Sequence, residues 1–482
     1  MKIPKLLIIL FLIVFLFRLY FVLQTNYFSD DSSYGQLRIM DSVKESGIPL
    51  GYDTLSYGGK QILPSLLFPY ILWLFSLVPY GLKIFPQLII SLLVIIVYYL
   101  SKEIINNEKL ALIAATLAGF TPLLINETLN KISVYFLAIP LIFFMIYAFN
   151  RIKEINYKII FYITAIIISL LDPIFLCLVF VFIFYLILMY TEDVKLHKSE
   201  ITSIIIFSII IILINLYILK DALVLYGLDI IYKNIPKSLL INTFKKIDVL
   251  TLVYHLGYIP LIFGFIALYH GFVKEKSRII YLISSLIFVS LSLVALNVLN
   301  FYVGLVLVGI AVSILSIISI NRLIIYLNLT KLSKYNSFFI PILLILILLF
   351  SIYPSYEISK KLISDVSIKD EIDSLLWIKN NSEQNDVIIG TIYEGNLISY
   401  FSNRKNFFDT SFLFVQDPLQ RMIDAEKVFT QDYSSASEVF KKYNIKYIFL
   451  SDKAKAIYGI KDLKYKDSNC LEKYDFVYKI IC

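Results

Sequence analysis

The stretch YFSDDSSYGQLRI, residues Tyr27–Ile39, comes directly after the apolar run Leu6–Leu23 and places two adjacent carboxylates where a membrane helix would end. Loops that stay on the cytoplasmic side of a membrane are usually basic, whereas Asp30 and Asp31 are acidic. The apolar run follows basic residues and lacks a small-residue cleavage site, so we interpret it as a retained first span. The stretch is therefore predicted to open a loop on the outer side of the membrane.

The composition of the chain is typical of a polytopic helical membrane protein. Its 482 residues are 59% hydrophobic and 17% charged, and its mean hydropathy of +0.79 exceeds what one soluble core can bury. The net charge of +8 would suit nucleic acid, but the basic residues lie in short loops and form no basic stripe. We therefore expect a lipid bilayer, and no nucleic acid, as a partner. The three cysteines are too few for a disulfide scaffold or a cysteine-based metal site.

Eleven apolar segments have membrane-spanning character, from Leu6–Leu23 to Phe338–Tyr353. A further apolar stretch, Ile62–Val78, is ambiguous, and the distribution of basic residues decides how we interpret it. If this stretch dips into the outer leaflet and the N-terminus lies inside, the inner loops are rich in lysine and arginine, and the short outer loops carry only Lys131. We therefore predict about eleven spans, with the N-terminus inside and the C-terminus outside the cytoplasm.

The hydropathy falls sharply near the end of the last span, which predicts two domains. Residues 1–354 would form the transmembrane domain with a catalytic first outer loop, 24–83, and residues 355–482 a soluble extracytoplasmic α/β domain. Within the second domain we expect two buried strands and one helix, namely Asp386–Ile392, Ile445–Leu450 and Ser434–Asn444. The segment 220–249 mixes apolar and basic residues and is predicted to form an amphipathic helix on the membrane surface.

The first outer loop holds the densest set of polar residues. Paired carboxylates at a membrane surface can bind a divalent cation, or one of them can act as a general base. Residues 34–44 fit an amphipathic helix that ends near Gly47 and Pro49. Asp53, Tyr57 and Lys60 follow in a glycine-containing turn, where the lysine could meet an anionic phosphate. The alternative is that these residues only mark a hydrated interfacial loop.

The sequence DDSSYGQLRI, followed by a Gly-x-Pro and by KQILPSLLFPY, resembles the first outer loop of the GT-C glycosyltransferases. This superfamily includes protein O-mannosyltransferases and aminoarabinose transferases acting on lipid A. Asp30, Asp31 and Tyr34 match the spacing of its D-[DE]-x-x-Y motif. The resemblance implies that Asp30 is the catalytic carboxylate and Asp31 its positioning neighbour or a ligand of Mg or Mn. It also places Lys60 near a lysine that binds the donor phosphate in some members.

The resemblance further implies the reaction and one more acidic residue. Such enzymes transfer a sugar from a polyprenyl-phosphate donor to a glycan, lipid or protein acceptor on the outer side, while a carboxylate takes the acceptor's proton. Many members use an acidic residue in the second outer loop, and Glu127 is the carboxylate of the corresponding loop NETLNKIS, residues 126–133. A helix-end residue in contact with water is the alternative interpretation of Glu127.

A second resemblance concerns YEGNLISYFSNRKNFFDTSF, residues 393–412, which is similar to the segment around the Trp-Trp-Asp motif of oligosaccharyltransferase catalytic subunits. The matching positions include Gly395, Arg404 and Asp409, and Arg404 is a candidate for substrate binding or a surface residue. However, Thr391, Ile392 and Tyr393, followed by Glu394, stand where the Trp-Trp-Asp motif would read a sequon. This departure disfavours transfer to asparagine sequons.

Two alternatives to the glycosyltransferase function stay open at this point. One is oligosaccharyltransferase-like transfer of a lipid-linked glycan to protein, and the other is a transporter or flippase for such glycans. A transporter would more often show broken helices in two halves and charges within its spans. Arg18 is one charge within a span and could face the helix bundle. Cys470 and Cys482, on the expected oxidising side, could pair.

Overall fold

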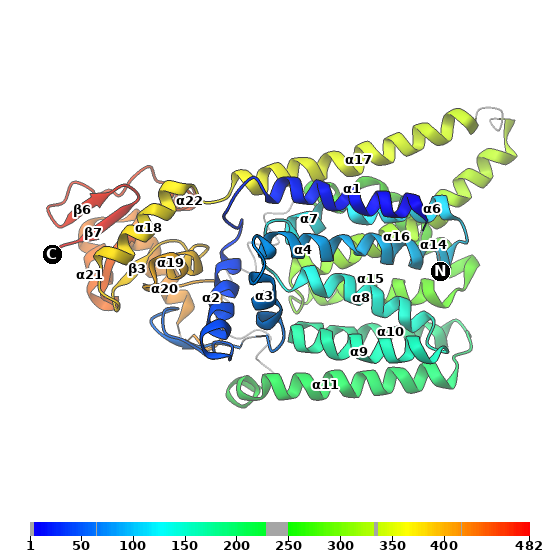
Figure 1. Cartoon of the computed structure of the whole chain (residues 1–482), viewed down its shortest axis with the longest axis horizontal. Coiled ribbons are helices and arrows are strands. Elements are labelled where there is room, and N and C mark those ends of the chain that lie inside the picture. The colour runs from blue at the N-terminus through cyan, green and yellow to red at the C-terminus, as the bar shows by residue number, and fades with distance from the viewer. Residues whose placement is uncertain (1–3, 64, 228–248, 332–335, 416) are drawn as a thin grey trace. The chain divides into compact units, whose positions relative to one another are not determined.

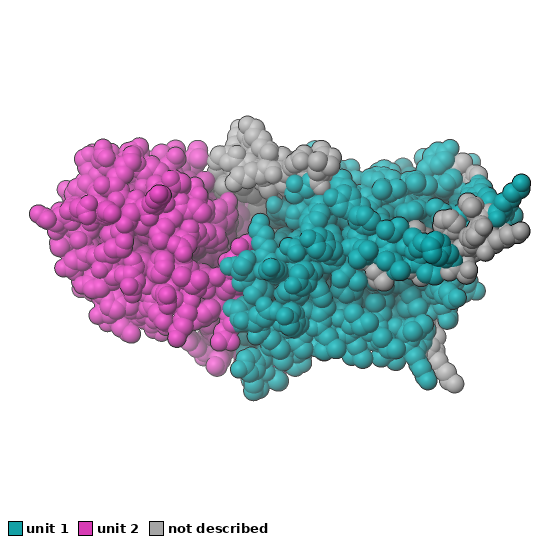
Figure 2. Space-filling model, turned by 90° about the horizontal axis from the view of Figure 1, so that it is seen from above, with its two compact units in different colours: residues 1–25, 75–220, 243–364 teal, residues 26–74, 221–242, 365–482 magenta. Residues whose placement is uncertain are grey.

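The computed structural model forms two compact units, shown in different colours in Figure 2. The helical unit comprises residues 1–25, 75–220 and 243–364, and the sheet unit comprises residues 26–74, 221–242 and 365–482. The residues whose structure is described are 4–63, 65–227, 249–331, 336–415 and 417–482. The amphipathic helix expected in segment 220–249 lies almost wholly outside the described residues.

The helical unit is built from apolar helices in series (Figure 1). They are α1 (Lys5–Val22), α4 (Gly81–Ser91), α5 (Leu93–Ile104), α6 (Glu108–Gly119), α7 (Pro122–Thr128), α8 (Tyr135–Asn150), α9 (Ile155–Leu171), η1 (Pro173–Leu176), α10 (Cys177–Thr191), α11 (Lys198–Tyr226, which ends in the other unit), α13 (Val249–Leu256), α14 (Tyr258–His270), η3 (Gly271–Glu275), α15 (Arg278–Ala295), α16 (Phe301–Leu329) and α17 (Asn336–Ser364).

Among the described residues, six helices are long and apolar enough to cross a membrane, or seven if the bent pair α6 and α7 counts as one span. Every residue of the most apolar stretch of α16 is buried, whereas α1 exposes large apolar side chains such as Leu6 and Leu16. An exposed apolar face on a long helix is stable in lipid rather than in water. The expected polytopic helical membrane architecture is therefore confirmed, while eleven spans and their orientation stay predictions.

The sheet unit combines the first loop with the C-terminal segment. The loop forms α2 (Asp31–Ser46), the antiparallel hairpin β1 (Tyr52–Asp53) and β2 (Lys60–Gln61), and α3 (Phe68–Ser76), which ends in the other unit. The C-terminal elements are α18 (Lys369–Asn381), β3 (Val387–Ile389), α19 (Gly395–Ser402), β4 (Lys405–Asn406), α20 (Pro418–Thr430), α21 (Tyr433–Tyr443), β5 (Ile445–Phe449), α22 (Asp452–Tyr458), β6 (Leu471–Tyr474) and β7 (Val477–Ile480).

A five-stranded mixed sheet with the order β4-β3-β5-β7-β6 organises this unit. Strand β3 pairs in parallel with β4 and β5, and β7 pairs antiparallel with β5 and β6. The strands β3 and β5 lie within the apolar runs that predicted them, and the helix α21 lies where the helical spacing of apolar residues predicted it. Cys470 and Cys482 form a disulfide next to the β6–β7 hairpin. The C-terminal part of the chain therefore contains a mixed α/β sheet region, while an extracytoplasmic domain of residues 355–482 stays a prediction.

The first loop belongs to the sheet unit because its hairpin supplies part of that unit's core. Tyr57 is buried among apolar residues that include Ile389 and Phe407, and its hydroxyl donates to the carbonyl oxygen of Asp409 at 2.6 Å. The expected division at residue 354 instead grouped loop 24–83 with the spans. Among the described residues of the apolar stretch 62–78, α3 is the helical part. The stretch does not begin as a helix, because the N–H of Ile62 still belongs to the hairpin and donates to the carbonyl oxygen of Gly51 at 3.0 Å.

Candidate functional site

The paired aspartates begin helix α2. Asp30 is the N-cap residue with an extended backbone, and its carboxylate accepts hydrogen bonds from the hydroxyls of Ser32 and Ser33. Helix α2 ends at Gly47, whose backbone is left-handed at φ 78°, a conformation that glycine adopts without steric cost. Asp30 is half-buried, so its carboxylate stays within reach of a substrate while two hydroxyls hold it in place.

Asp31 is buried, and both of its oxygens face helix α19. Oδ1 accepts from the backbone N–H of Leu397 and Oδ2 from the side-chain amide of Asn396, each at 2.8 Å. Burial raises the pKa of the Asp31 carboxyl to about 7, the two hydrogen bonds oppose the shift, and the charge of Asp409 adds to it. Asp31 therefore fastens the start of α2 to α19 and changes charge near neutral pH.

Gly35 lies where α2 packs against α19. A Cβ placed on Gly35 would lie 2.9 Å from Oδ1 of Asn396, closer than side-chain contacts normally allow. Because Asn396 donates to Asp31, this close approach and the hydrogen bonds of Asp31 depend on each other. The glycine in the motif DDSSYG therefore serves the packing of the site.

A buried ion pair joins the hairpin to the C-terminal segment. Nζ of Lys60 lies 3.0 Å from Oδ1 of Asp409 and donates to the carbonyl oxygen of Ser411 at 2.6 Å. Asp409 also accepts hydrogen bonds from Asn406 at 3.2 Å and from the hydroxyl of Ser56. Burial lowers the pKa of the Lys60 ammonium, and the Asp409 carboxylate opposes this shift. The lysine that was expected to meet a donor phosphate is therefore held by a carboxylate of its own chain.

Arg38 and Asp53 form a second ion pair in the same unit. The guanidinium donates to both carboxylate oxygens of Asp53, one of them at 2.9 Å. Asp53 also accepts from the backbone N–H groups of Leu55 and Ser56 at 2.9 and 3.1 Å. A two-point arginine–carboxylate contact fixes orientation as well as distance. The pair therefore fixes the β1–β2 hairpin against α2.

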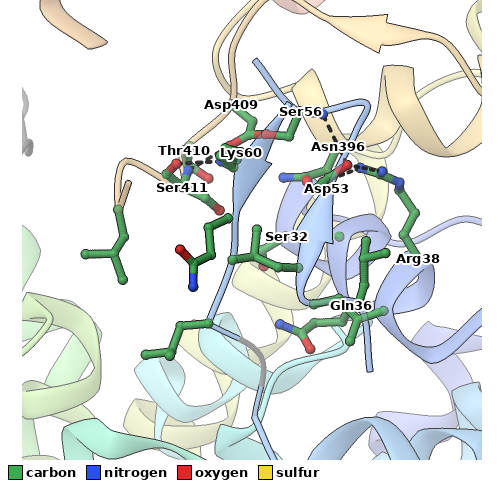
Figure 3. A pocket seen from close by; sticks show the side chains of 17 residues that line it. Ser32, Gln36, Arg38, Asp53, Ser56, Lys60, Asn396, Asp409, Thr410 and Ser411 are labelled. Atoms are coloured by element: carbon green, nitrogen blue, oxygen red, sulfur yellow. Dashed lines mark hydrogen bonds and ion pairs between the residues drawn. The ribbon is translucent and has the colours of Figure 1, made fainter. Parts of the chain in front are cut away.

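The Arg38–Asp53 and Lys60–Asp409 pairs line a cavity of about 270 Å³ within the sheet unit, and Asn396 lines it as well. Figure 3 shows Arg38 pointing to Asp53 and Lys60 pointing to Asp409 among the side chains that line it. Hydroxyl and amide groups supply most of the remaining polar lining, and aliphatic side chains such as Leu413 supply the apolar part. Ser32, which donates to Asp30, also lines the cavity. A cavity with hydroxyls, amides and paired charges is chemically suited to a polyhydroxylated ligand.

Three other predicted site residues, Tyr34, Tyr57 and Arg404, belong to the sheet unit but do not line this cavity. The Tyr34 hydroxyl accepts from the backbone N–H of Phe28 at 3.1 Å, and Tyr57 lies in the core. The guanidinium of Arg404 donates to the hydroxyl and the carbonyl oxygen of Ser382, each at 2.8 Å, as an internal brace of the domain. Glu127 belongs to the helical unit and accepts from the side chain of Asn126 at 2.8 Å.

Two participants of the site were not assigned roles from the sequence. Arg38 stands within the quoted motif, and Asn396 within the segment that resembles the oligosaccharyltransferases. No sequence pattern distinguishes either residue from its neighbours. Glu394, which stands near the missing Trp-Trp-Asp motif, is buried and accepts hydrogen bonds from Thr391 and Ser451, each at 2.6 Å. Its role is internal, so this position does not present a free carboxylate to an acceptor.

The described residues do not assemble a donor set of three or more histidine, cysteine or acidic side chains for a divalent cation. In the part of the chain that the structure describes, no group of three or more histidine, cysteine, aspartate or glutamate side chains is positioned to hold a metal ion. Asp30 accepts from two serines and Asp31 from α19, so the adjacent carboxylates face different partners. We therefore derive no catalytic step through a metal.

Comparison with solved structures identifies the fold. An oligosaccharyltransferase of Archaeoglobus fulgidus tethered to an acceptor peptide with an NVT sequon matches with a TM-score of 0.64 at 16% identity, covering 92% of this chain and 69% of that one. The same archaeal protein, AglB, in complex with an inhibitory peptide and a dolichol-phosphate matches with a TM-score of 0.61 at 15% identity, over 92% and 69%. It also matches in its complex with Zn and sulfate, with a TM-score of 0.59.

ArnT from Cupriavidus metallidurans bound to undecaprenyl phosphate matches with a TM-score of 0.54 at 11% identity, covering 98% of this chain and 97% of that one. No protein-family model matches the chain, and no curated protein matches it. The fold and the site define a polytopic helical membrane protein with a mixed α/β unit built around its first loop. The chain shares its fold with the archaeal oligosaccharyltransferase and with ArnT, at identities of 16% and 11%.

Proposed function

We propose that this protein is a membrane glycosyltransferase that transfers a sugar from a polyprenyl-phosphate-linked donor to an acceptor outside the cytoplasm. The observation that carries the proposal is the pair Asp30–Asp31 at the start of α2, beside a polar cavity, on a GT-C fold. The solved relatives of this fold were bound to dolichol-phosphate and undecaprenyl phosphate, which supports a donor of the same chemical class. The acceptor is a glycan, a lipid or a protein.

In the proposed reaction, Asp30 is the general base. The acceptor's oxygen or nitrogen attacks the anomeric carbon of the sugar, and its proton passes to the Asp30 carboxylate. The bond between the anomeric carbon and the donor phosphate breaks, and the bonding electrons leave with the polyprenyl phosphate. Asp30 is half-buried, and Ser32 and Ser33 hold its carboxylate, an arrangement that orients a base without removing it from a substrate's reach.

Asp31 acts as a positioning residue in this proposal. Its bonds to Asn396 and Leu397 fix the start of α2, and thereby the direction in which Asp30 points. The cavity lined by Arg38 and Asn396 would hold the transferred sugar or the acceptor, since ion pairs and amides suit hydroxyl groups. Tyr34 and Tyr57 then support the site through packing of the first loop.

The remaining site assignments stay predictions. Lys60 would contact the donor phosphate only if its pair with Asp409 opened, which makes it the weaker candidate for that role. Glu127 would assist from the second outer loop, and Arg404 would bind substrate only if it left its internal partners. The last assignment is Asp31 as a ligand of a divalent cation, Mg or Mn. Dialysis against a chelator tests it, and activity that survives dialysis would exclude a requirement for the cation.

The topology belongs to the same proposal. About eleven spans, an N-terminus inside and the sheet unit outside the cell membrane follow from the distribution of basic residues, and the disulfide Cys470–Cys482 supports an oxidising location of the sheet unit. Cysteines introduced at the exposed positions Ser46 and Ser434 should react with an impermeant reagent in intact cells, whereas one at Thr191 should not. Protection of the first two would contradict the orientation.

Oligosaccharyltransferase-like transfer to protein is the second candidate, because the archaeal relative was solved with an acceptor peptide. The internal hydrogen bonds of Glu394 disfavour sequon reading at the corresponding position. A flippase is the third candidate. We favour it least because, among the described residues, the paired carboxylates and the polar cavity both lie in the sheet unit.

The deciding experiment is a lipid analysis of cells that lack the protein. We expect them to accumulate a polyprenyl-phosphate sugar or a truncated glycan, and the wild-type gene to restore the normal profile where Asp30→Asn does not. Restoration by Asp30→Asn would contradict a transferase that uses this base, and a donor trapped on the inner leaflet would indicate a flippase.

A further inference from the structure

Arg18 lies fully inside the helical unit, on the membrane helix α1. Its side chain is 1% exposed, and its Nε donates to Oε1 of Gln87 at 3.0 Å. A second nitrogen of the guanidinium donates to the hydroxyl of Thr128, which itself donates to the carbonyl oxygen of Leu124. All of these partners are neutral, so they satisfy hydrogen bonds without balancing the positive charge.

No carboxylate of the described residues lies within 4.0 Å of the Arg18 guanidinium, in contrast to Arg278 in the same unit, which pairs with Glu200 at 2.7 Å. The acid nearest in sequence to Thr128 is Glu127, whose carboxylate accepts from Asn126 at 2.8 Å and faces Lys131 at 3.9 Å. An arginine keeps its charge at any physiological pH, and an intramembrane charge that the protein itself does not compensate is a mark of function.

A second cation lies on the same helix face as the partner of Arg18. Lys83 stands one turn before Gln87 on α4, is 7% exposed, and donates to Oδ1 of Asn130. Residues four apart on a helix are neighbours on its surface, and Asn130 follows Thr128 by two positions. The cluster Arg18, Lys83, Gln87, Thr128 and Asn130 therefore joins α1, α4 and the end of α7, which lie side by side in the helical unit (Figure 1).

The depth of this cluster suits a lipid headgroup. Arg18 is four residues from the end of α1 at Val22, a rise of about 6 Å along the helix. Lys83 is two residues from the start of α4, and Thr128 is the last residue of α7. All three are thus near the helix ends that meet at one edge of the bundle, where the phosphate of a membrane lipid would lie.

We infer that this cluster is a binding site for the phosphate group of a prenyl phosphate, an inference that rests on the proposed function because the ligand belongs to the chemical class of the proposed donor. Arginine matches phosphate oxygens with two parallel N–H donors, and lysine adds a second point charge. Gln87 and Asn130 add amide groups next to these cations. The prenyl chain would lie in the lipid next to α1, whose outward face is apolar. An anion at this point would balance the charge that the neutral partners of Arg18 leave uncompensated.

The test uses the purified full chain in detergent and farnesyl phosphate as the probe, read out by thermal unfolding and by equilibrium binding. Farnesyl phosphate should raise Tm of the wild type, and farnesol, inorganic phosphate and phosphatidic acid should not at the same concentration. Arg18→Gln should weaken farnesyl phosphate binding about tenfold or more, the loss expected for a charge-assisted hydrogen bond to a phosphate. Lys83→Gln should weaken it in the same direction, and the matched control Arg278→Gln should leave it unchanged.

The stability of the empty variants separates a ligand site from a structural arginine. If the site awaits an anion, Arg18→Gln without ligand should unfold at or above the wild-type Tm and should lose the shift with farnesyl phosphate. A lowered Tm with an intact shift would show that Arg18 is structural and would overturn the inference. Equal binding of phosphatidic acid or of inorganic phosphate would overturn the prenyl assignment. Binding that depends on Arg18 in a chain without transferase activity would instead overturn the proposed function alone.

Discussion

Lys60 and Asp409, which are 349 positions apart in the sequence, form an ion pair in which the two side chains are 3% and 1% exposed. The pair links the hairpin of the first loop to the segment that follows α19. Removing one partner of a buried pair typically costs about 3–5 kcal/mol, because the other charge stays buried without compensation. The sheet unit therefore depends on the first loop for stability, and the loop depends on the sheet unit for its shape.

Lys60→Met should for this reason lower the stability of the protein by several kcal/mol, measured by urea unfolding of the purified chain. The control Lys102→Met removes the lysine of an exposed pair with Glu108 and should leave stability close to that of the wild type, because solvent screens exposed pairs. If Lys60→Met instead leaves stability unchanged and raises KM for the donor, the lysine contacts the donor phosphate and the structural role is wrong.

Asp30→Asn should reduce kcat by about 10²- to 10⁴-fold, the usual contribution of a general base, with little change in stability. One serine hydroxyl can still donate to the amide oxygen and the other can accept from the amide NH2 group, so the local fold is kept. Asp41→Asn, on the same helix, is the matched control and should retain activity. A transfer assay with a polyprenyl-phosphate sugar checks both variants; equal loss in the two would point to a general effect of charge on α2.

The pKa of Asp31 predicts a pH dependence of stability. The pKa is about 7 in the folded chain against an ordinary value of 3.8, so between these pH values the folded state holds a proton that the unfolded state has released. The stability that Asp31 contributes should therefore be fully present at about pH 4 and below, fall as the pH rises towards 7, and level off above it, by about 1.4 kcal/mol for each unit of pKa difference.

Asp31→Asn should flatten this part of the pH profile, measured as Tm from pH 4 to pH 8, because an amide does not titrate. The exposed Asp365→Asn is the control and should keep the wild-type profile. A variant Asp31→Asn with the same slope as the wild type would show that another group titrates in this range.

The sequence predicts the membrane class, the loop helix and the two inner strands, because each depends on local patterns of apolar residues. The end of α2 next to Gly47 also follows from a local signal, whereas the helix begins at Asp31, three residues before the predicted start at Tyr34. The partners of the site residues do not follow from such signals, since the contacts of Asp31 with Asn396 and of Lys60 with Asp409 span more than 300 positions. A pattern of single residues carries no information about which distant side chain will face it.

The same limit explains the domain boundary. Hydropathy separates apolar spans from polar segments, so it assigns a loop between two spans to the membrane part of the chain. The structure instead groups the first loop with the sheet unit, because the ring of Tyr57 is buried with Ile389 and Phe407. Hydropathy gives no information about such contacts between distant residues. Long-range packing therefore decides which compact unit the first loop joins.

Gly35→Ala should disturb the site without unfolding the chain. The added Cβ would lie 2.9 Å from Oδ1 of Asn396, so Asn396 must move and weaken its hydrogen bond to Asp31. We expect a loss of about 1–3 kcal/mol of stability, as for other overpacked contacts, together with reduced kcat. Gly51→Ala, where no atom lies within 4 Å of the added Cβ, is the matched control. Unchanged activity in Gly35→Ala would show that the contact between α2 and α19 does not position Asp30.

Reduction of the disulfide Cys470–Cys482 should lower the stability of the sheet unit. The two residues are 12 positions apart, and a loop of this size restricts the unfolded chain enough to contribute about 2–4 kcal/mol. Dithiothreitol should therefore lower Tm of the wild type and leave the double variant Cys470→Ser/Cys482→Ser unaffected. Cys177→Ser, which removes the buried free cysteine, is the control and should respond to dithiothreitol as the wild type does. In intact cells, Cys470 and Cys482 should resist alkylation until they are reduced; free thiols at both positions would place the sheet unit on the reducing side and overturn the proposed orientation.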